Sequence, residues 1–311
     1  MLHSLLAWVR LLRLPNHATA VADVLAGYCI VSQYRTIAWP APALWWAILA
    51  SLGFYAAGMV QNDLFDLAID REERPQRPLP SGQVSVRSAA LAGNILLSIG
   101  SLAACITAVA AQSPWPAIVG ALLTAAVWIY NRHAKLTSLG PAVMGSCRSL
   151  NWLLGMTAAG GPQAAYEWLI PIGMGVYVMG ITVYARDEAE ESRSGPLAAG
   201  TLIMLVGLAT AGLSPWLASR AEDAGGWLVG VKLSNWLLLW GMLTLSILLR
   251  AALGIFDPTS ARVQQAVGNA IMAIITLDAV LVLATCGEPW SILVLMLLVP
   301  FFLGRRFVSP T

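Results

Sequence analysis

The chain has 311 residues, of which 58% are hydrophobic and 11% are charged, and its mean hydropathy is +0.71. Soluble domains carry about 25% charged residues, so this composition excludes a water-soluble globular enzyme. A disordered chain, which needs the opposite composition, is excluded as well. Because about twenty apolar residues cross a bilayer once, the length allows about nine or ten crossings. The net charge of +2 gives no indication of a nucleic-acid partner, and we expect none.

The N-terminus predicts an amphipathic helix on the membrane surface and not a cleavable signal. Arg10 and Arg13 interrupt its apolar stretch, and no small-residue cleavage site follows. The apolar residues between positions 5 and 12 suit a helix that lies in the interface. The four cysteines form no Cys-x-x-Cys pair, which argues against zinc and redox motifs of that type.

The rest of the chain predicts an all-α, multi-pass bundle of nine to ten transmembrane helices around a central cavity. We expect one integral-membrane domain over residues 1–311. The expected spans cover residues 18–34, 43–61, 87–111, 115–131, 138–159, 167–185, 196–218, 227–249, 264–285 and 288–304.

Lysine and arginine predict a cytoplasmic N-terminus, because cytoplasmic loops carry an excess of both. Fourteen of them fall in loops on the side of the N-terminus, and the opposite loops hold only Arg35 and Arg220. Ten spans keep Arg305 and Arg306 on the basic side, whereas nine would not. We expect a bacterial-type cytoplasmic membrane, with the active site on its cytoplasmic side.

The acidic residues are gathered in two short stretches. Nine of the 16 Asp and Glu lie in 63–73 and 187–191, on the same predicted side of the membrane and four spans apart. An even number of crossings preserves orientation, so we expect a diverged parallel repeat of 18–131 and 138–249, followed by C-terminal helices over 264–304. The two stretches would then face each other across one cavity.

The first stretch has the spacing of a metal site. Asp63, Asp66 and Asp70 sit at i, i+3 and i+7, which share one face of a helix. Such stacked like charges favour a cation, and Mg²⁺ takes carboxylate and phosphate oxygens. Arg74 and Arg77 lie just downstream and suit the same phosphates. The alternative is a solvated helix end with ordinary charges.

The motif Asn-Asp-x-x-Asp-x-x-x-Asp at 62–70, followed by Arg-Pro-x-Arg-Pro-Leu-Pro-Ser-Gly at 74–82, resembles the first signature of the UbiA superfamily of intramembrane prenyltransferases. Three further regions are similar to the EboC-type branch of that superfamily, and the last third of the chain resembles the branch more diffusely. The three regions are 13–16 with 22–27, 140–151 and 184–189.

The resemblance implies that Asp63, Asp66 and Asp70 hold Mg²⁺. In most of the superfamily, an Asp-x-x-x-Asp motif at the second stretch holds a second Mg²⁺. Here Asp187 and Glu191 keep that spacing, and the likeness to the EboC-type branch adds Glu188. The departure from the usual motif leaves two alternatives open, a second metal site and a merely polar loop.

The resemblance also implies substrate-binding residues. Tyr130 and Lys135 would contact the diphosphate, although Lys135 could equally be an ordinary basic residue of a cytoplasmic loop. The other implied substrate-binding residues are Asn16, Asp23, Asn62, Arg74, Arg77, Arg148, Asn151 and Arg186. The candidate catalytic residues are Asp63, Asp66, Asp70, Lys135 and Arg148.

Arg148 stands out because ionisable residues within membrane spans are costly and are often functional. It lies one helical turn from Asn151, so both side chains face one way. By resemblance it would line the diphosphate or acceptor pocket. The alternative is a structural ion pair with Asp23 or Asp278, which also lie in apolar runs.

Together these features predict Mg²⁺-dependent prenyl transfer inside the membrane. The partners would be an allylic prenyl diphosphate, a lipophilic or aromatic acceptor and the lipid bilayer. An alternative is a membrane binding or transport subunit that keeps the diphosphate site without turnover. Alcohol phosphotransfer between lipid head groups is disfavoured, because its Asp-Gly-x₂-Ala-Arg signature is missing from the sequence. The acceptor, the prenyl chain length and the oligomeric state stay open.

Overall fold

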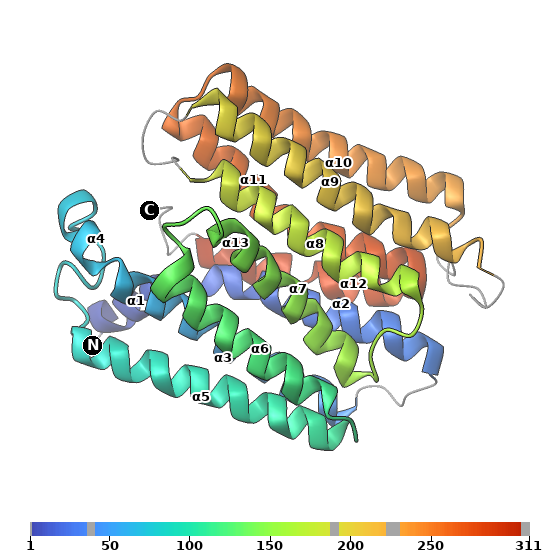
Figure 1. Cartoon of the computed structure of the whole chain (residues 1–311), viewed down its shortest axis with the longest axis horizontal. Coiled ribbons are helices and arrows are strands. Elements are labelled where there is room, and N and C mark those ends of the chain that lie inside the picture. Colours follow the sequence, from blue (N-terminus) through green and yellow to red (C-terminus); the bar gives the residue numbers. More distant parts are fainter. Residues whose placement is uncertain (1, 36–40, 187–192, 222–230, 306–311) are drawn as a thin grey trace.

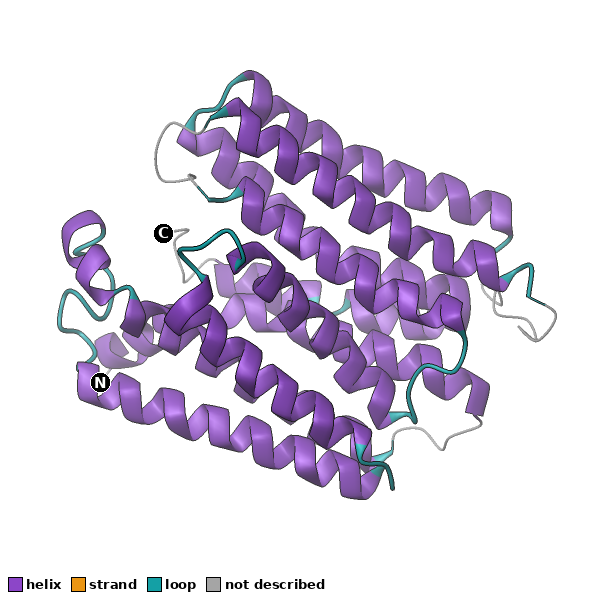
Figure 2. Ribbon diagram, in the orientation of Figure 1, coloured by secondary structure: helices purple, strands orange, loops and turns teal. Residues whose placement is uncertain are grey.

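The computed structural model describes residues 2–35, 41–186, 193–221 and 231–305. These residues form helices and loops with no strand, and the longer helices run lengthwise beside one another (Figures 1 and 2). The first seven helices are α1 (Leu2–Leu11), α2 (His17–Arg35), α3 (Pro42–Phe65), α4 (Leu67–Glu73), α5 (Val86–Ala110), α6 (Trp115–Ile129) and α7 (Gly140–Ala158). The others are α8 (Ala165–Tyr184), α9 (Ser194–Ala218), α10 (Leu233–Phe256), α11 (Ser260–Cys286), α12 (Glu288–Leu295) and α13 (Leu298–Arg305).

Six helices of the described segments are long and apolar enough to cross a membrane, namely α3, α5, α8, α9, α10 and α11. The prediction of an all-helical, multi-pass membrane protein is therefore confirmed. The other expected spans overlap α2, α6, α7 and the pair α12 and α13, so the count of nine or ten spans stays a prediction. Three other expectations also stay predictions. They are the cytoplasmic N-terminus, the central cavity and the parallel repeat.

The expected tenth span over 288–304 coincides with the apolar helices α12 and α13, which are separated by a short turn at positions 296–297, and its crossing of the membrane stays a prediction. Pro300 explains the interruption. Proline has no N–H to donate to the carbonyl four residues earlier, which here belongs to Met296. The N–H of Val299 bonds that carbonyl instead, at 3.0 Å, and this tighter turn separates the two helices. The expected eighth span, 227–249, also differs, since α10 begins at Leu233 and ends at Phe256.

The N-terminal helix α1 packs on the protein with one face. Ala7 and Leu11 are fully buried, in a small apolar cluster with residues of α3, α5 and the loop between them. Leu5, by contrast, is exposed. The predicted amphipathic helix is present, and its contact with a membrane surface stays a prediction.

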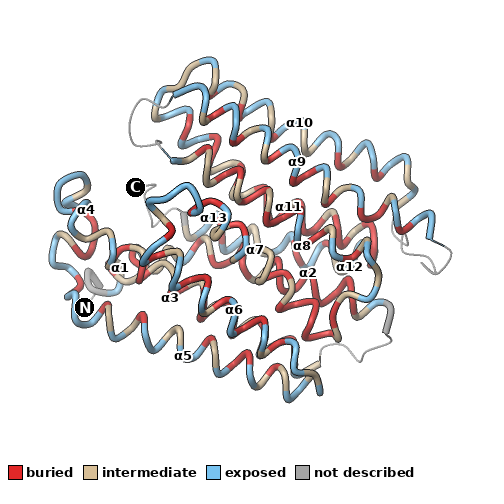
Figure 3. Tube along the Cα trace, in the orientation of Figure 1, coloured by how far each residue is buried: buried red, intermediate tan, exposed pale blue. Residues whose placement is uncertain are grey.

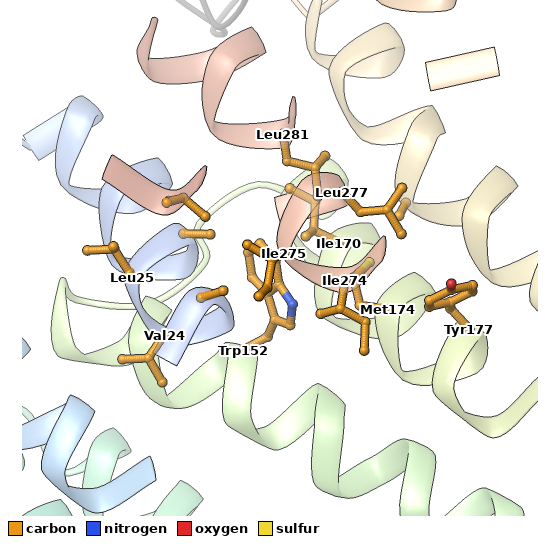
Figure 4. Close-up of a cluster of buried hydrophobic side chains, with 14 of the residues drawn as sticks. Val24, Leu25, Trp152, Ile170, Met174, Tyr177, Ile274, Ile275, Leu277 and Leu281 are labelled. Carbon is orange, nitrogen blue, oxygen red and sulfur yellow. The ribbon is translucent and has the colours of Figure 1, made fainter. Parts of the chain in front are cut away.

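Helix α2 lies at the centre of the bundle. It packs against α3, α7 and α11, and nearly every described residue from His17 to Val31 is buried (Figure 3). Figure 4 shows apolar side chains of α2, α7, α8 and α11 meeting in the core beside it. A helix surrounded on all sides carries its polar groups into the interior, where each of them requires a partner.

Backbone contact fixes the position of α2 against α7. A Cβ atom added to Gly155 of α7 would lie 2.2 Å from the carbonyl oxygen of Val24, and one added to Gly27 would lie 2.8 Å from the carbonyl oxygen of Trp152. Only glycine permits so close an approach. The contact sets which side chains of α2 and α7 stand at the same depth.

We expect the substitution Gly155→Ala to destabilise the bundle by about 1–3 kcal/mol, because the added methyl group must push α2 away from α7. The matched control is Gly241→Ala on α10, where no described atom lies within 4 Å of the added Cβ. Thermal unfolding of the purified protein in detergent measures both. Equal unfolding temperatures for the two variants would contradict the assigned contact.

Candidate active site

The acidic motif lies where α3 ends. Helix α3 stops at Phe65, and Asp66 is both its C-terminal cap and the residue before α4. The expected single helix is therefore divided at Asp66, although Arg77 lies near both Asp63 and Asp70. Stacked like charges repel each other. In the structure each of the three carboxylates turns instead to a basic partner.

Asp63 is buried and pairs with Arg13. The guanidinium Nη2 of Arg13 donates to Asp63 Oδ1 at 3.2 Å, across 50 residues of sequence. Arg77 Nη1 lies 3.9 Å from the same oxygen. Arg13 also has a left-handed backbone, with φ 48° and ψ 47°, which is uncommon for a residue other than glycine and recurs at functional sites.

Asp70 and Arg77 form the most buried ion pair of this group. Arg77 Nη1 donates to both oxygens of Asp70, at 2.8 and 3.0 Å, and both side chains are almost fully buried. Arg74 lies further away, at 3.9 Å from Asp70 Oδ1, and is part-exposed. The downstream basic residues thus fold back onto the acidic motif.

The basic partner of Asp66 is Lys135, which lies in the loop after α6. Lys135 Nζ pairs with Asp66 Oδ2 and donates to Asn62 Oδ1 at 2.7 Å. Asn62 Nδ2 in turn donates to Asp66 Oδ2 at 3.2 Å. Residues Tyr130–Ala134 form a π-helical turn, a local feature frequent at functional sites, and Lys135 follows it. Tyr130 lies within electrostatic reach of Asp66.

Among the described residues, the cluster holds three carboxylates and four basic groups, Arg13, Arg74, Arg77 and Lys135. Its net charge is therefore positive before any metal is added, which suits an anionic ligand. No three of the described His, Cys, Asp and Glu side chains stand close enough to hold a metal ion. The oxygen donors are of the kind that Mg²⁺ prefers, but here they are shared with side-chain cations.

A second polar cluster lies deeper, between α2, α3 and α7. Arg148 Nη1 pairs with Asp23 Oδ2 and donates to the carbonyl oxygen of Thr19 at 3.2 Å. Asn151 Nδ2 donates to Asp23 Oδ2 at 2.7 Å, and Ser51 Oγ donates to Asn151 Oδ1 at 2.6 Å. The ion pair that was one alternative for Arg148 is present. Its role in a substrate pocket stays a prediction.

Tyr55 of α3 links the two clusters. Its side chain lies close to that of Asn16 and within electrostatic reach of Arg13 in the first cluster and of Arg148 in the second. The two clusters are far apart along α3, since Ser51 and Asp63 are twelve residues apart, or about 18 Å at the rise of an α-helix. Asn16 thus lies between them, beside the predicted diphosphate site.

The second acidic stretch cannot be placed in the same way. Asp187, Glu188 and Glu191 lie outside the described residues, so the predicted second metal site stays a prediction. Arg186 follows the end of α8 and is exposed, and no hydrogen bond or ion pair brings it to the residues of the first cluster that the structure describes. The structure therefore does not join Arg186 to Asp63, Asp66 and Asp70.

Sequence reasoning did not single out Arg13 and Tyr55 as site residues. Arg13 belongs to the Arg-Leu-Pro-Asn stretch that carries part of the family resemblance, so a signal was present. Tyr55 sits in an apolar run, where one tyrosine is not distinctive. Only the packing of α3 against the start of α2 brings Tyr55 to Asn16.

Comparison with known proteins shows the family of the chain. The sequence model of the UbiA prenyltransferase family matches residues 20–275, and the chain belongs to this family. The likeness to the EboC-type branch stays a prediction.

Curated relatives include digeranylgeranylglyceryl phosphate synthases. The protein of Ignicoccus hospitalis is 28% identical over 182 residues, which are 56% of this chain and 55% of that protein. The protein of Sulfurisphaera tokodaii is 31% identical over 97 residues, which are 31% of this chain and 34% of that protein. The chain thus spans only about a third to about half the length of these relatives.

A solved structure has a similar fold. It is a UbiA homolog from Archaeoglobus fulgidus bound to GPP and Mg²⁺, with a TM-score of 0.57 and 15% identity, and the match covers 87% of this chain and 99% of that one. At this identity the likeness shows the fold alone.

We expect the substitution Arg77→Ala to lower the free energy of unfolding by about 3–5 kcal/mol, because it leaves Asp70 buried without its bidentate partner. Arg77→Lys keeps the charge but loses the two-pronged geometry, so it should recover only part of the loss. Arg71→Ala, at an exposed residue of the same segment, is the control. Thermal unfolding measures all three, and an Arg77→Ala protein as stable as the control would exclude the buried pair.

Proposed function

We propose that this chain transfers a prenyl group from an allylic prenyl diphosphate to a lipophilic or aromatic acceptor within the membrane and releases diphosphate. The observation that carries the proposal is the first cluster, in which Asp63, Asp66 and Asp70 meet four basic side chains at one end of the bundle. Membership of the UbiA prenyltransferase family supports it, as does the fold shared with a homolog bound to GPP and Mg²⁺.

The basic residues would bind the diphosphate. Lys135, Arg74 and Arg13 are part-exposed, so their donors are accessible to phosphate oxygens. Arg77 is buried against Asp70, and in this structure it orients the acidic motif. When the C1–O bond of the prenyl diphosphate breaks, these cations stabilise the negative charge that develops on the leaving group.

Asp63, Asp66 and Asp70 would hold Mg²⁺, together with phosphate oxygens of the substrate. The metal would supply further neutralisation of the leaving diphosphate. Because the carboxylates are paired with Arg13, Lys135 and Arg77 here, we expect the metal and the diphosphate to bind together. The phosphate oxygens would then bind the basic side chains, and the carboxylates would be free to hold the metal.

The acceptor would attack C1 of the allylic cation and lose a proton. Apolar side chains around the reaction site would have to exclude water, which would otherwise capture the cation. The relatives are named for a product with two geranylgeranyl groups on a glyceryl phosphate, so a singly prenylated glyceryl phosphate is the first acceptor to assay. Phenols and other aromatic acceptors come next.

A second candidate is a membrane binding or transport subunit that retains prenyl diphosphate without turnover. One observation favours the binding subunit. The first cluster has four basic groups and only three carboxylates, so its net charge is positive without a metal. Such a site would bind the diphosphate without a metal. Release of labelled diphosphate separates the two functions, since only the enzyme produces it.

We expect the substitution Asp66→Asn to reduce diphosphate release by at least about a hundredfold, because it removes a metal ligand and the counter-charge of Lys135. The assay uses purified protein in lipid vesicles with labelled geranylgeranyl diphosphate, Mg²⁺ and each acceptor in turn. Glu72→Gln, at an exposed residue of α4, should retain activity. Binding of the diphosphate without release under any acceptor would exclude the enzyme and support the binding subunit.

Removal of Mg²⁺ with a chelator should abolish release, and re-addition should restore it. Under the same conditions, binding of geranylgeranyl diphosphate should weaken but persist, because Arg13, Arg74 and Lys135 remain. Calorimetric titration of the protein in the presence of the chelator measures the affinity for geranylgeranyl diphosphate. Full activity in the chelator would disprove the metal requirement.

A further inference from the structure

Asp278 of α11 is a buried acid outside the first cluster. Its side chain is fully buried, and neither of its oxygens has a hydrogen-bond partner among the described residues. It lies against the deeper polar cluster, within hydrogen-bonding reach of Asp23 and within electrostatic reach of Arg148. A group of this kind is costly in a membrane interior unless its charge is matched or removed.

The partners around Asp278 do not match a second negative charge. Asp23 on α2 and Arg148 on α7 already form an ion pair with each other. Tyr177 on α8 lies within electrostatic reach of Asp278, but its hydroxyl donates to the carbonyl oxygen of Ala270 at 2.8 Å. Two carboxylates therefore share one guanidinium, and like charges this close disfavour the ionised form of one of them.

The hydrogen bonds show which carboxylate keeps the charge. Oδ2 of Asp23 accepts from Arg148 and from Asn151, and such donors stabilise an anion. Within the described structure, Asp278 accepts no hydrogen bond, and Oδ1 of Asp23 also has no donor. One proton placed on Asp278 supplies a donor for that Asp23 oxygen and cancels the unmatched charge.

We propose that Asp278 is a neutral carboxylic acid whose O–H donates to Asp23 Oδ1, and that the resulting acid pair positions Arg148. The pair connects α11 to α2 and α7. It keeps Asp23 anionic as the counter-ion of Arg148, whose guanidinium also donates to Thr19 of α2. Asp278 is thus a positioning residue that acts through Asp23, and the proposal does not depend on prenyl transfer.

Three variants separate charge from hydrogen bonding. Asp278→Asn is neutral and keeps an N–H donor, so its unfolding temperature should lie within about 2 °C of the parent protein. Asp278→Ala is neutral but has no donor and leaves a cavity, so it should unfold several degrees lower. Asp23→Asn leaves Arg148 buried without a counter-ion and should be the least stable. Asp257→Asn, at a part-exposed residue paired with Arg262 at 2.7 Å, is the control for the amide substitution.

Infrared spectroscopy tests the proton directly. At neutral pH in D₂O, the purified protein should show the carbonyl stretch of a protonated carboxylic acid. The band should be missing in Asp278→Asn and retained in Asp257→Asn. This readout distinguishes protonation from a merely structural role, and it requires no substrate, so a failure of prenyl transfer would leave it unchanged.

Three results would overturn the proposal. The first is the absence of a protonated carboxyl band in the parent protein, or its persistence in Asp278→Asn. The second is an Asp278→Ala protein as stable as Asp278→Asn, which would make the donor unnecessary. The third is an Asp278→Asn protein as unstable as Asp23→Asn, which would mean that Asp278 carries a charge.

Discussion

A carboxylate inside a membrane bundle requires a cation or a proton, because the low dielectric of the interior penalises an unmatched charge. This requirement connects segments that are distant in sequence. Asp63 is matched by Arg13 before α2, Asp66 by Lys135 after α6, and Asp70 by Arg77 in the loop before α5. The acidic motif thereby orders the loops around it, and those loops in turn carry the groups suited to a diphosphate.

The same requirement acts at greater depth, where α2 is surrounded on all sides. Asp23 can be accommodated there because α7 approaches closely enough to bring Arg148 and Asn151 to it. That approach depends on backbone contact at Gly27 and Gly155. Packing of small residues and pairing of charges thus support each other, and Tyr55 joins this interior cluster to the diphosphate end.

Much of the fold could be predicted from local patterns, and the exceptions have local causes. Apolar runs located the helices, since hydropathy is a sum over neighbouring residues. Hydropathy does not indicate the turn between α12 and α13, because a single proline, Pro300, removes one backbone donor within an apolar run. The division of the acidic motif at Asp66 was missed because the i, i+3, i+7 spacing assumes one uninterrupted helix.

The sequence by itself determined a helical membrane protein, an acidic motif with basic residues downstream, and the family to which it belongs, because composition and short spacings record these directly. Tertiary structure alone decided which cation meets which carboxylate. Arg13 and Asp63 are 50 residues apart, Lys135 and Asp66 are 69 apart, and Arg148 and Asp23 are 125 apart. Such pairs follow from how α2, α3 and α7 pack, and a local pattern cannot encode contacts made by helices that meet only in the folded bundle.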